Sequence, residues 1–414
     1  MSIKCLVQKY ITLYFKLSML FVPLLMHTSG SIKKLIIFMV LFSLLGLIIN
    51  EHKVDWLYPE KIIIFLFFVF FSIHFVDFIV HEGALRELDT PSRMFIFVPL
   101  YIFIRKLEIS PYWLIVGFIF AGFFIGLNEI ALKHYPENFH LKILSTSYHS
   151  GEAAFFASIF GITSLLLIHH ARSFWLNAFL TITALICIYV SYFYGGRGAW
   201  VAAFLTTSLV VILNPLRWAI IYRFTFLVLL VVSFAFSYFF KLAKVDERIN
   251  NLSKNTISWF EDGKVRSSSA GQRLELWKSA FLISKDNIIF GIGENSFKEY
   301  KKVLIDEGKI NEGVSKFNHP HSEYLSVLVE QGIFGLIFLL FFLLYPIFMI
   351  CKFTRTKIDL SAKSLKTFLL VILFHYLFYG IANGVFDHQS TTLFFAFYVL
   401  AGLGLLRHSL GANQ

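Results

Sequence analysis

Charged residues are scarce in this chain, and their scarcity excludes most soluble folds. Aspartate, glutamate, lysine and arginine make up 15% of the 414 residues, whereas hydrophobic residues make up 57%. An ordinary soluble domain carries roughly 25% charged residues. Because much of any folded surface faces water, a soluble fold of this length cannot bury so many apolar side chains. The composition therefore predicts an integral membrane protein.

Cysteine is also rare, and its placement excludes a disulfide framework. The three cysteines are Cys5, Cys187 and Cys351, and none lies in the long polar segment 241–322. Their spacing fits no metal site. The sequence therefore predicts neither a metal nor any other cofactor.

What the chain has instead is a succession of apolar runs long enough to cross a bilayer, which needs roughly 20 residues. We predict an all-α, polytopic membrane protein with about twelve transmembrane helices. The fourth run is the shortest, because only residues 94–104 separate Arg93 from Arg105. Either both arginines reach for the membrane surface or the span has longer boundaries. The expected spans lie near residues 10–27, 35–50, 61–80, 94–104, 111–131, 152–168, 174–193, 198–213, 218–240, 323–350, 365–383 and 391–407.

Basic residues predict the orientation. With a cytoplasmic N-terminus, the inside segments hold about twice as many lysines and arginines as the short outside loops, as the positive-inside rule requires. We therefore expect both termini in the cytoplasm and the segment 241–322 outside. The same topology explains the net charge of +11, so nucleic acid is not an expected partner.

The expected topology divides the chain into three regions. Residues 1–240 carry transmembrane helices 1–9, residues 241–322 form one large outer loop, and residues 323–414 carry helices 10–12. The loop alone has soluble-domain character, and we expect it to be partly helical and to hold the catalytic residues.

Within the outer loop, residues 271–285 have the pattern of an amphipathic helix. Leu274, Trp277, Phe281 and Leu282 recur at helical spacing. Such a helix packs either on a small core of the loop itself or on the membrane surface. A glycine-punctuated turn at 290–293 and a second helical stretch near 295–306 are expected to follow.

An arginine surrounded by glycines lies between the spans 174–193 and 198–213. The segment reads Tyr194-Gly195-Gly196-Arg197-Gly198-Ala199-Trp200. Glycine lets a bulky ligand approach the backbone, and a guanidinium offers a planar fork of donors that suits phosphate oxygens. The alternative is a tight inter-helix turn whose arginine only reaches for the membrane surface.

A second arginine, Arg273, lies near the start of the predicted helix 271–285, with Trp277 one turn further on. A cation is poorly placed there, because the backbone N–H groups of a helix N-terminus favour anions. A bound anion would explain the arginine. The alternative is a solvated surface side chain.

Two histidines, His319 and His321, precede the span 323–350. Imidazole titrates near neutral pH and serves as a general base, although a structural histidine pair is the common alternative. A zinc site needs a third ligand at a recognisable spacing, and only Glu323 is near, so no metal is predicted. Asp387 and His388, in the last outside turn, are candidates to line the same cavity.

Taken together, these segments resemble the O-antigen ligase and polymerase superfamily over roughly residues 185–340. The similar pieces occur in one order around a large outer loop. Asparagine commonly follows the second histidine in that family, whereas this chain has Ser322, which puts any role of that side chain in doubt. The pieces are 195–200, 271–277, 289–293 with Phe297, 319–325 and 330–336.

The resemblance implies a glycosyltransferase of the inner membrane of a Gram-negative bacterium. The ligases transfer a glycan from undecaprenyl pyrophosphate to the lipid A-core oligosaccharide on the periplasmic side, and the polymerases use a second lipid-linked chain as acceptor. Polymerases tend to have two sizeable outer loops, whereas the outer loops 81–93 and 132–151 are short here, which favours the ligase. The expected partners are therefore the lipid-linked glycan, the lipid A-core acceptor and membrane lipids.

The resemblance also implies roles for the candidate residues. Arg197 and Arg273 would hold the pyrophosphate in a metal-independent, inverting transfer. His321, at the position of the family's second histidine, would serve as the base, with His319 as the alternative. The residues expected to line the substrate are Gly196, Gly198, Trp277, His319, Glu323 and Tyr324.

Two readings from other classes remain at this point. A lipid-linked glycan transporter would be expected to show inverted repeats and broken helices near mid-membrane, and neither is evident in the sequence. A membrane scaffold without catalytic activity would explain the spans but not three coincident basic sites.

The topology is directly testable. Reporter fusions at positions 273 and 321 should report a non-cytoplasmic location, because both positions lie in the outer loop. A cytoplasmic reporter at either position contradicts the predicted site.

Overall fold

The computed structural model describes residues 3–26, 31–49, 58–81, 84–134, 150–168, 173–213, 269–353 and 359–411, with isolated positions between 247 and 259. The expected span 218–240 and the segment 260–268 lie outside the described residues. Within the described residues the chain is helical and contains no β-strand, as the all-α prediction requires.

Helices occupy each of the expected spans within the described residues, although the fourth is divided. The 3-10 turns are η1 (Leu85–Leu88) and η5 (Glu312–Val314). The α-helices are α1 (Ile3–Leu25), α2 (Ser31–Ile49), α3 (Tyr58–Val80), α4 (Asp89–Ile96), α5 (Val98–Ile104), α6 (Tyr112–His134), α7 (Ser150–Leu167), α8 (Phe174–Tyr194), α9 (Arg197–Leu213), α12 (Ser269–Asp286), α13 (Phe297–Asp306), α14 (Glu323–Phe353), α15 (Leu360–Tyr379) and α16 (Gln389–Gly411).

Seven of the described helices are long and apolar enough to cross a membrane, namely α3, α6, α7, α8, α14, α15 and α16. Shorter apolar stretches occur in α2 and α9. The protein therefore has the helices of a multi-pass membrane protein. The total of about twelve spans stays a prediction, since part of the chain lies outside the description.

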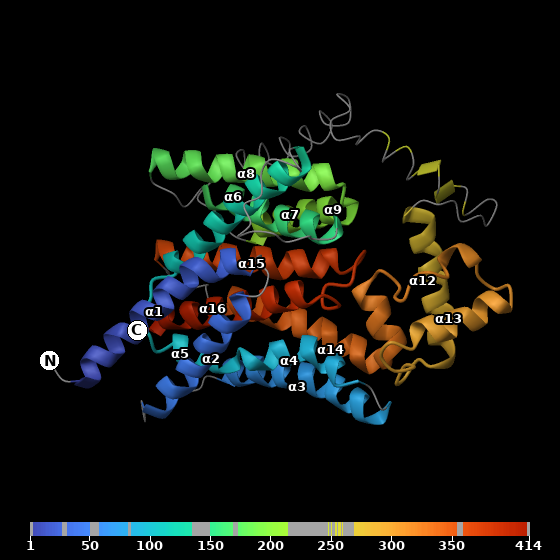
Figure 1. Cartoon of the computed structure of the whole chain (residues 1–414), viewed down its shortest axis with the longest axis horizontal. Coiled ribbons are helices and arrows are strands. Elements are labelled where there is room, and N and C mark those ends of the chain that lie inside the picture. The colour runs from blue at the N-terminus through green and yellow to red at the C-terminus, as the bar shows by residue number, and fades with distance from the viewer. Residues whose placement is uncertain are drawn as a thin grey trace.

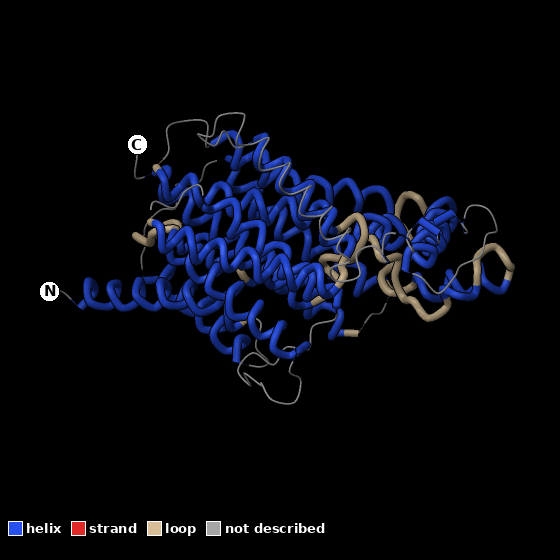
Figure 2. Tube along the Cα trace, turned by 90° about the horizontal axis from the view of Figure 1, so that it is seen from above, coloured by secondary structure: helices blue, strands red, loops and turns tan. Residues whose placement is uncertain are grey.

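The long helices form one bundle, with α12 and α13 at one end of it (Figure 1). The start of α1 and the end of α16 lie at the other end, and the view from above gives the same placement (Figure 2). The first and last described helices therefore begin and end, respectively, on the opposite side of the bundle from the loop helices. The count of basic residues predicts this relation, and which side is the cytoplasm stays a prediction.

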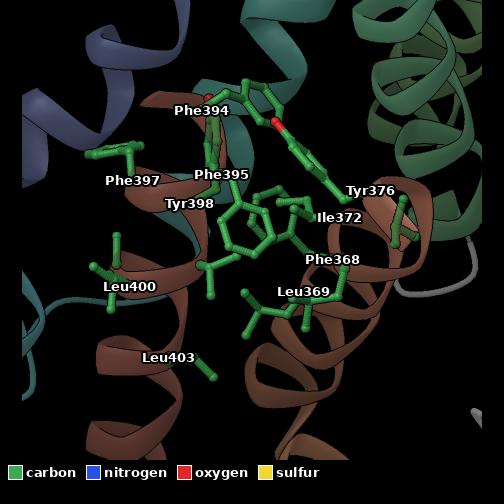
Figure 3. Packing of buried hydrophobic residues seen from close by; sticks show 14 of the residues in the cluster. Phe368, Leu369, Ile372, Tyr376, Phe394, Phe395, Phe397, Tyr398, Leu400 and Leu403 are labelled. Atoms are coloured by element: carbon green, nitrogen blue, oxygen red, sulfur yellow. The ribbon is translucent and has the colours of Figure 1, made fainter. Parts of the chain in front are cut away.

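The centre of the bundle is made by α15 and α16. The Tyr376 hydroxyl donates to the Thr391 carbonyl at 2.6 Å, so the buried phenol keeps an acceptor in an apolar setting. Figure 3 shows buried side chains of both helices, among which Phe397 points away from α15 and packs on Phe97: Phe368, Leu369, Ile372, Tyr376, Phe394, Phe395, Phe397, Tyr398, Leu400 and Leu403.

The fourth expected span, 94–104, is not one helix. α4 ends at Ile96 and α5 begins at Val98, with Phe97 between them. Pro99 lies in the first turn of α5, and proline lacks the N–H that would continue the preceding helix. The fourth expected span is therefore not one continuous helix but two short helices packed against α16. That this segment crosses the membrane stays a prediction.

The predicted loop helix is present as α12, and the predicted second helix as α13. Leu276, Ala280 and Ile283 of α12 face a small core that also contains Phe297 of α13. The helix therefore packs on the loop's own core. The predicted apolar face is wrong at Phe281, which is 59% exposed, because α13 and α14 pack on the neighbouring face of α12.

The glycine turn 288–293 docks against a break in α14. Within α14, Gly332 has φ 70° and ψ −165°, so the helix is interrupted at that residue. The Ile292 N–H donates to the Val329 carbonyl at 2.9 Å, and the Ile333 N–H donates to the Ile288 carbonyl at 2.8 Å. The glycine turn of the loop and the glycine of α14 are far apart in the sequence. In the structure they form one joint, in which backbone hydrogen bonds hold the loop to α14.

Glycine at the joint should be required for stability. A Cβ on Gly332 would overlap the Ile289 carbonyl, and its backbone conformation by itself costs a non-glycine residue about 1–3 kcal/mol. Gly332→Ala should therefore lower the free energy of unfolding by about 3 kcal/mol or more, measured by thermal unfolding of the solubilised protein.

Gly308 provides the matched control. Its φ is also positive, at 69°, but nothing lies within 4 Å of an added Cβ. Gly308→Ala should cost only about 1–2 kcal/mol. Equal losses in the two variants would contradict a role for the close approach at Gly332.

Candidate functional site

Arg197 opens α9 directly after the turn that ends α8. Gly195 closes α8 with φ 70°, which glycine adopts without strain. The Trp200 indole Nε1 donates to the Ser191 carbonyl at 3.1 Å and so joins the first turn of α9 to the last turn of α8. The tight inter-helix turn is thus present, and it fixes the position from which Arg197 extends.

Arg273 lies near the N-terminal end of α12 and is half-buried. Its Nη2 donates to Oδ1 of Asn383 at 3.3 Å. Burial lowers the pKa of the Arg273 guanidinium, and the neighbouring Tyr379 opposes this shift. Arginine nevertheless keeps its proton at neutral pH, so the structure holds a permanent cation in a partly desolvated place.

Asn383 joins the two arginine segments. Besides accepting from Arg273, its Nδ2 lies 3.0 Å from the position that a Cβ on Gly198 would occupy. The Gly198 Cβ position also lies 3.8 Å from the Tyr379 ring. The start of α9 and the start of α12 therefore meet at the turn 380–388, which connects α15 to α16.

The two glycines beside Arg197 have packing reasons of their own. A Cβ on Gly196 would overlap the Ala154 side chain of α7, and Gly198 lies against Asn383 and Ala382. Close packing against other parts of the protein is therefore sufficient to explain why both positions are glycine. Their role in substrate binding stays a prediction.

His319 and His321 lie side by side just before α14. Their ring centroids are 4.1 Å apart, and the backbone N–H of His321 donates to Nδ1 of His319 at 3.2 Å. His321 has φ 57°, which is rare for a residue other than glycine. His319 Nδ1 lies 3.8 Å from the Asp387 carboxylate, which belongs to the turn 380–388. All three candidate segments therefore reach the same turn.

The surroundings of both imidazoles lower their pKa and so favour the neutral form. Burial lowers the pKa of His321 to about 3, with further contributions from His319, the Arg273 guanidinium and His388. Burial also lowers the pKa of His319, although the Asp387 carboxylate opposes this shift. A neutral imidazole has a lone pair that can accept a proton. The lowered pKa makes His321 a weaker base than a free imidazole.

Glu323 and Tyr324 bind the backbone around the turn 380–388. The Glu323 N–H donates to the Gly380 carbonyl at 2.8 Å, and its Oε2 accepts from the N–H groups of Val385 and Phe386 at 2.7 and 3.1 Å. The Tyr324 hydroxyl donates to the Leu377 carbonyl at 2.6 Å. Their described contacts position the turn, and a direct contact with substrate stays a prediction.

Ser322 occupies the position at which the family commonly has asparagine. The side chain is buried, and its hydroxyl donates to the Gly380 carbonyl at 3.5 Å. Even where this chain departs from the family pattern, the residue therefore faces the same turn.

Lys301 is a positioning residue that the sequence did not single out. It is 1% exposed, and its Nζ donates to the carbonyls of Val314 at 2.7 Å, Ser315 at 3.2 Å and Phe317. The Phe317 ring in turn lies edge-on to the His321 ring at 5.2 Å. Lys301 therefore fixes the segment leading to the histidines. In the sequence it is one of several lysines in α13, and only its burial distinguishes it.

A second polar cluster joins the loop to α3. The Glu294 N–H donates to the Asp77 carboxylate at 3.1 Å, and the Glu294 carboxylate contacts His74. Gln331 of α14 donates to that same carboxylate at 3.4 Å. The histidine and aspartate of α3 therefore lie at the junction of this helix with the loop.

Trp277 follows Arg273 by one turn of α12 and is half-buried. Its indole N–H has no acceptor among the described residues, which is unusual for a buried donor. The same part of the chain contains no group of three histidine, cysteine or acidic side chains arranged to hold a metal ion. A metal-independent reaction stays a prediction.

The comparisons with known proteins agree with the resemblance. Residues 179–340 match the model of a family described as O-Antigen ligase. This range contains both candidate arginines and both histidines, and it confirms the resemblance to the O-antigen ligase and polymerase superfamily.

The chain is also similar to a protein of Haemophilus influenzae (strain ATCC 51907 / DSM 11121 / KW20 / Rd). The two are 22% identical over 368 residues, which are 86% of this chain and 90% of the relative. The relative is described as an uncharacterized protein, so the similarity brings no activity to this chain.

His321 should make the folded protein sensitive to acid. Its pKa is about 3 in the folded chain and about 6.5 when exposed, so the unfolded chain takes up the proton first as the pH falls. The contribution of His321 to the free energy of unfolding is therefore fully present above about pH 6.5 and decreases as the pH falls toward 3.

The measurement compares the wild type with His321→Asn, because asparagine tolerates a positive φ. Between pH 7 and pH 5 the wild type should lose about 1 kcal/mol more than the variant, a figure reduced for the partial exposure of the ring. Parallel stability curves would show that His321 is not held in its neutral form.

Proposed function

We propose that this relative of the O-antigen ligases is a glycosyltransferase that ligates O-antigen polysaccharide to lipid A-core oligosaccharide. The donor is the glycan on undecaprenyl pyrophosphate, and the reaction takes place on the periplasmic side of the inner membrane. The observation that carries the proposal is the meeting of the two arginine-bearing helix starts at Asn383, beside His319 and His321. All of these segments except Asn383 lie within the family match.

The two arginine segments provide the proposed pyrophosphate site. Arg197 begins α9, and Arg273 lies near the beginning of α12. The free N–H groups at a helix N-terminus attract anions, and guanidinium groups bind phosphate oxygens through paired hydrogen bonds. Two helix starts that meet at one turn, each carrying an arginine, favour a doubly charged phosphate ligand, and the two guanidinium groups would stabilise the charge that develops as the sugar bond breaks.

The histidines supply the proton acceptor. The acceptor hydroxyl attacks the anomeric carbon, the bond from that carbon to the pyrophosphate oxygen breaks, and the electron pair leaves with undecaprenyl pyrophosphate. The hydroxyl proton passes to His321, with His319 as the alternative base. Direct attack inverts the anomeric centre, and the guanidinium groups take the charge-neutralising role that a metal has in other transferases.

A deletion strain tests the ligase against the polymerase. Loss of a ligase should leave long glycan chains on the lipid carrier and bare lipid A-core. Loss of a polymerase should instead leave single repeat units attached to the core. The banding pattern of lipopolysaccharide and the profile of carrier-linked glycan distinguish the two, and an unchanged pattern contradicts both.

Arg197→Ala and Arg273→Ala should each lower transfer by about 100-fold or more, as loss of a charge-stabilising donor does. Arginine-to-lysine variants should recover little, because lysine lacks the planar fork. Lys278→Ala is the matched control, since this basic residue of α12 is 43% exposed and should be dispensable. Complementation of the deletion strain measures each variant, and normal surface O-antigen with Arg197→Ala contradicts the assignment.

His321→Ala should reduce transfer far more than His319→Ala. The first change removes the proposed base, whereas the second removes a neighbour that accepts a backbone hydrogen bond from it. Transfer by membranes of the complemented strain, with equal amounts of each variant present, measures the difference. The reverse order of effects identifies His319 as the base.

A further inference from the structure

The second half of α14 has a stripe of exposed apolar side chains. Phe334, Ile337, Phe341, Leu344 and Phe348 are 62%, 57%, 48%, 45% and 60% exposed. They recur every three or four residues and therefore follow one face of the helix. Since this helix is apolar and long enough to cross a membrane, the stripe is a lipid-facing surface.

The turn 288–290 of the outer loop continues this stripe past the break in α14. Ile288, Ile289 and Phe290 are 45%, 51% and 80% exposed. The Phe290 ring lies 6.3 Å from the ring of Phe334, the first residue of the stripe. Three consecutive exposed apolar side chains in an extramembrane loop therefore lie directly beside a surface that faces lipid.

The turn is held rigidly in this place. Its flanks form hydrogen bonds to α14 on both sides of Gly332, from Ile292 N–H to Val329 and from Ile333 N–H to the Ile288 carbonyl. Next along the chain, Gly293 packs against His81 at the end of α3. The apolar side chains of the turn are thus fixed at the ends of two membrane helices.

We propose that residues 288–290 insert into the bilayer as an anchor of the outer loop, in the leaflet on the α12 side of the bundle. The partner is lipid, because the turn is continuous with the lipid-facing stripe of α14 and none of its three side chains is charged. Large apolar and aromatic side chains at the membrane boundary favour insertion. The anchor lies immediately after α12 and so sets the height of Arg273 above the membrane. It does not rest on the proposed function.

The depth of a spin label tests the anchor. The full chain carries Cys5→Ala, Cys187→Ala and Cys351→Ala, and it is reconstituted into vesicles of phosphatidylethanolamine and phosphatidylglycerol. A nitroxide is attached at Phe290→Cys, and its collision rates with oxygen and with a water-soluble nickel chelate are compared.

Two positions provide the references. Phe334→Cys represents the lipid-facing stripe. Val303→Cys represents an exposed apolar residue of the same loop, since Val303 is 54% exposed on α13. The ratio of oxygen to nickel collisions at 290 should be several times the ratio at 303 and close to the ratio at 334. Ile289→Cys gives a second reading if the variant at 290 does not fold.

Two outcomes overturn the proposal. A ratio at 289 and 290 equal to the ratio at 303 places the turn in water. Low collision rates with both reagents, together with line broadening between labels, assign the surface to a second copy of the chain. Because no transfer activity is measured, the result is independent of whether the protein is a ligase.

Discussion

The clamp between Glu323 and the turn 380–388 is the interaction on which the candidate site depends. One carboxylate and one backbone N–H at the start of α14 satisfy backbone groups of Gly380, Val385 and Phe386. The turn 380–388 also contacts all three candidate segments. Asn383 contacts both the start of α9 and the side chain of Arg273, and Asp387 lies near His319. A buried carboxylate without such partners would be very unfavourable, so the clamp and the turn require each other.

The sequence predicted the elements of this arrangement better than their contacts. Apolar runs determine helices, because a bilayer leaves the backbone few alternatives, and the spans within the described residues are helical. The arginine and histidine segments could also be recognised as candidate functional segments, because such basic residues and glycines are unusual beside a membrane span. The break at Phe97 could have been predicted from Pro99, because proline interrupts a helix locally even within a continuous apolar run.

The contacts themselves could not be read from spacing. Helical period identifies a face of α12 but not the neighbour that covers it, so Phe281 was assigned to the wrong side. Nothing in the sequence distinguishes Lys301 from the lysines around it, or indicates that Asn383, expected inside a span, lies in a turn beyond the end of α15. These features depend on pairings between distant segments, and a single sequence contains no direct record of such pairings.

The position of the joining turn has a consequence for biogenesis. The turn 380–388 lies near the C-terminal end, so both arginine segments leave the ribosome before the residues that unite them exist. The candidate site can therefore be assembled only after the turn 380–388 has been synthesised, so a partly synthesised chain lacks the place at which the two arginine segments meet.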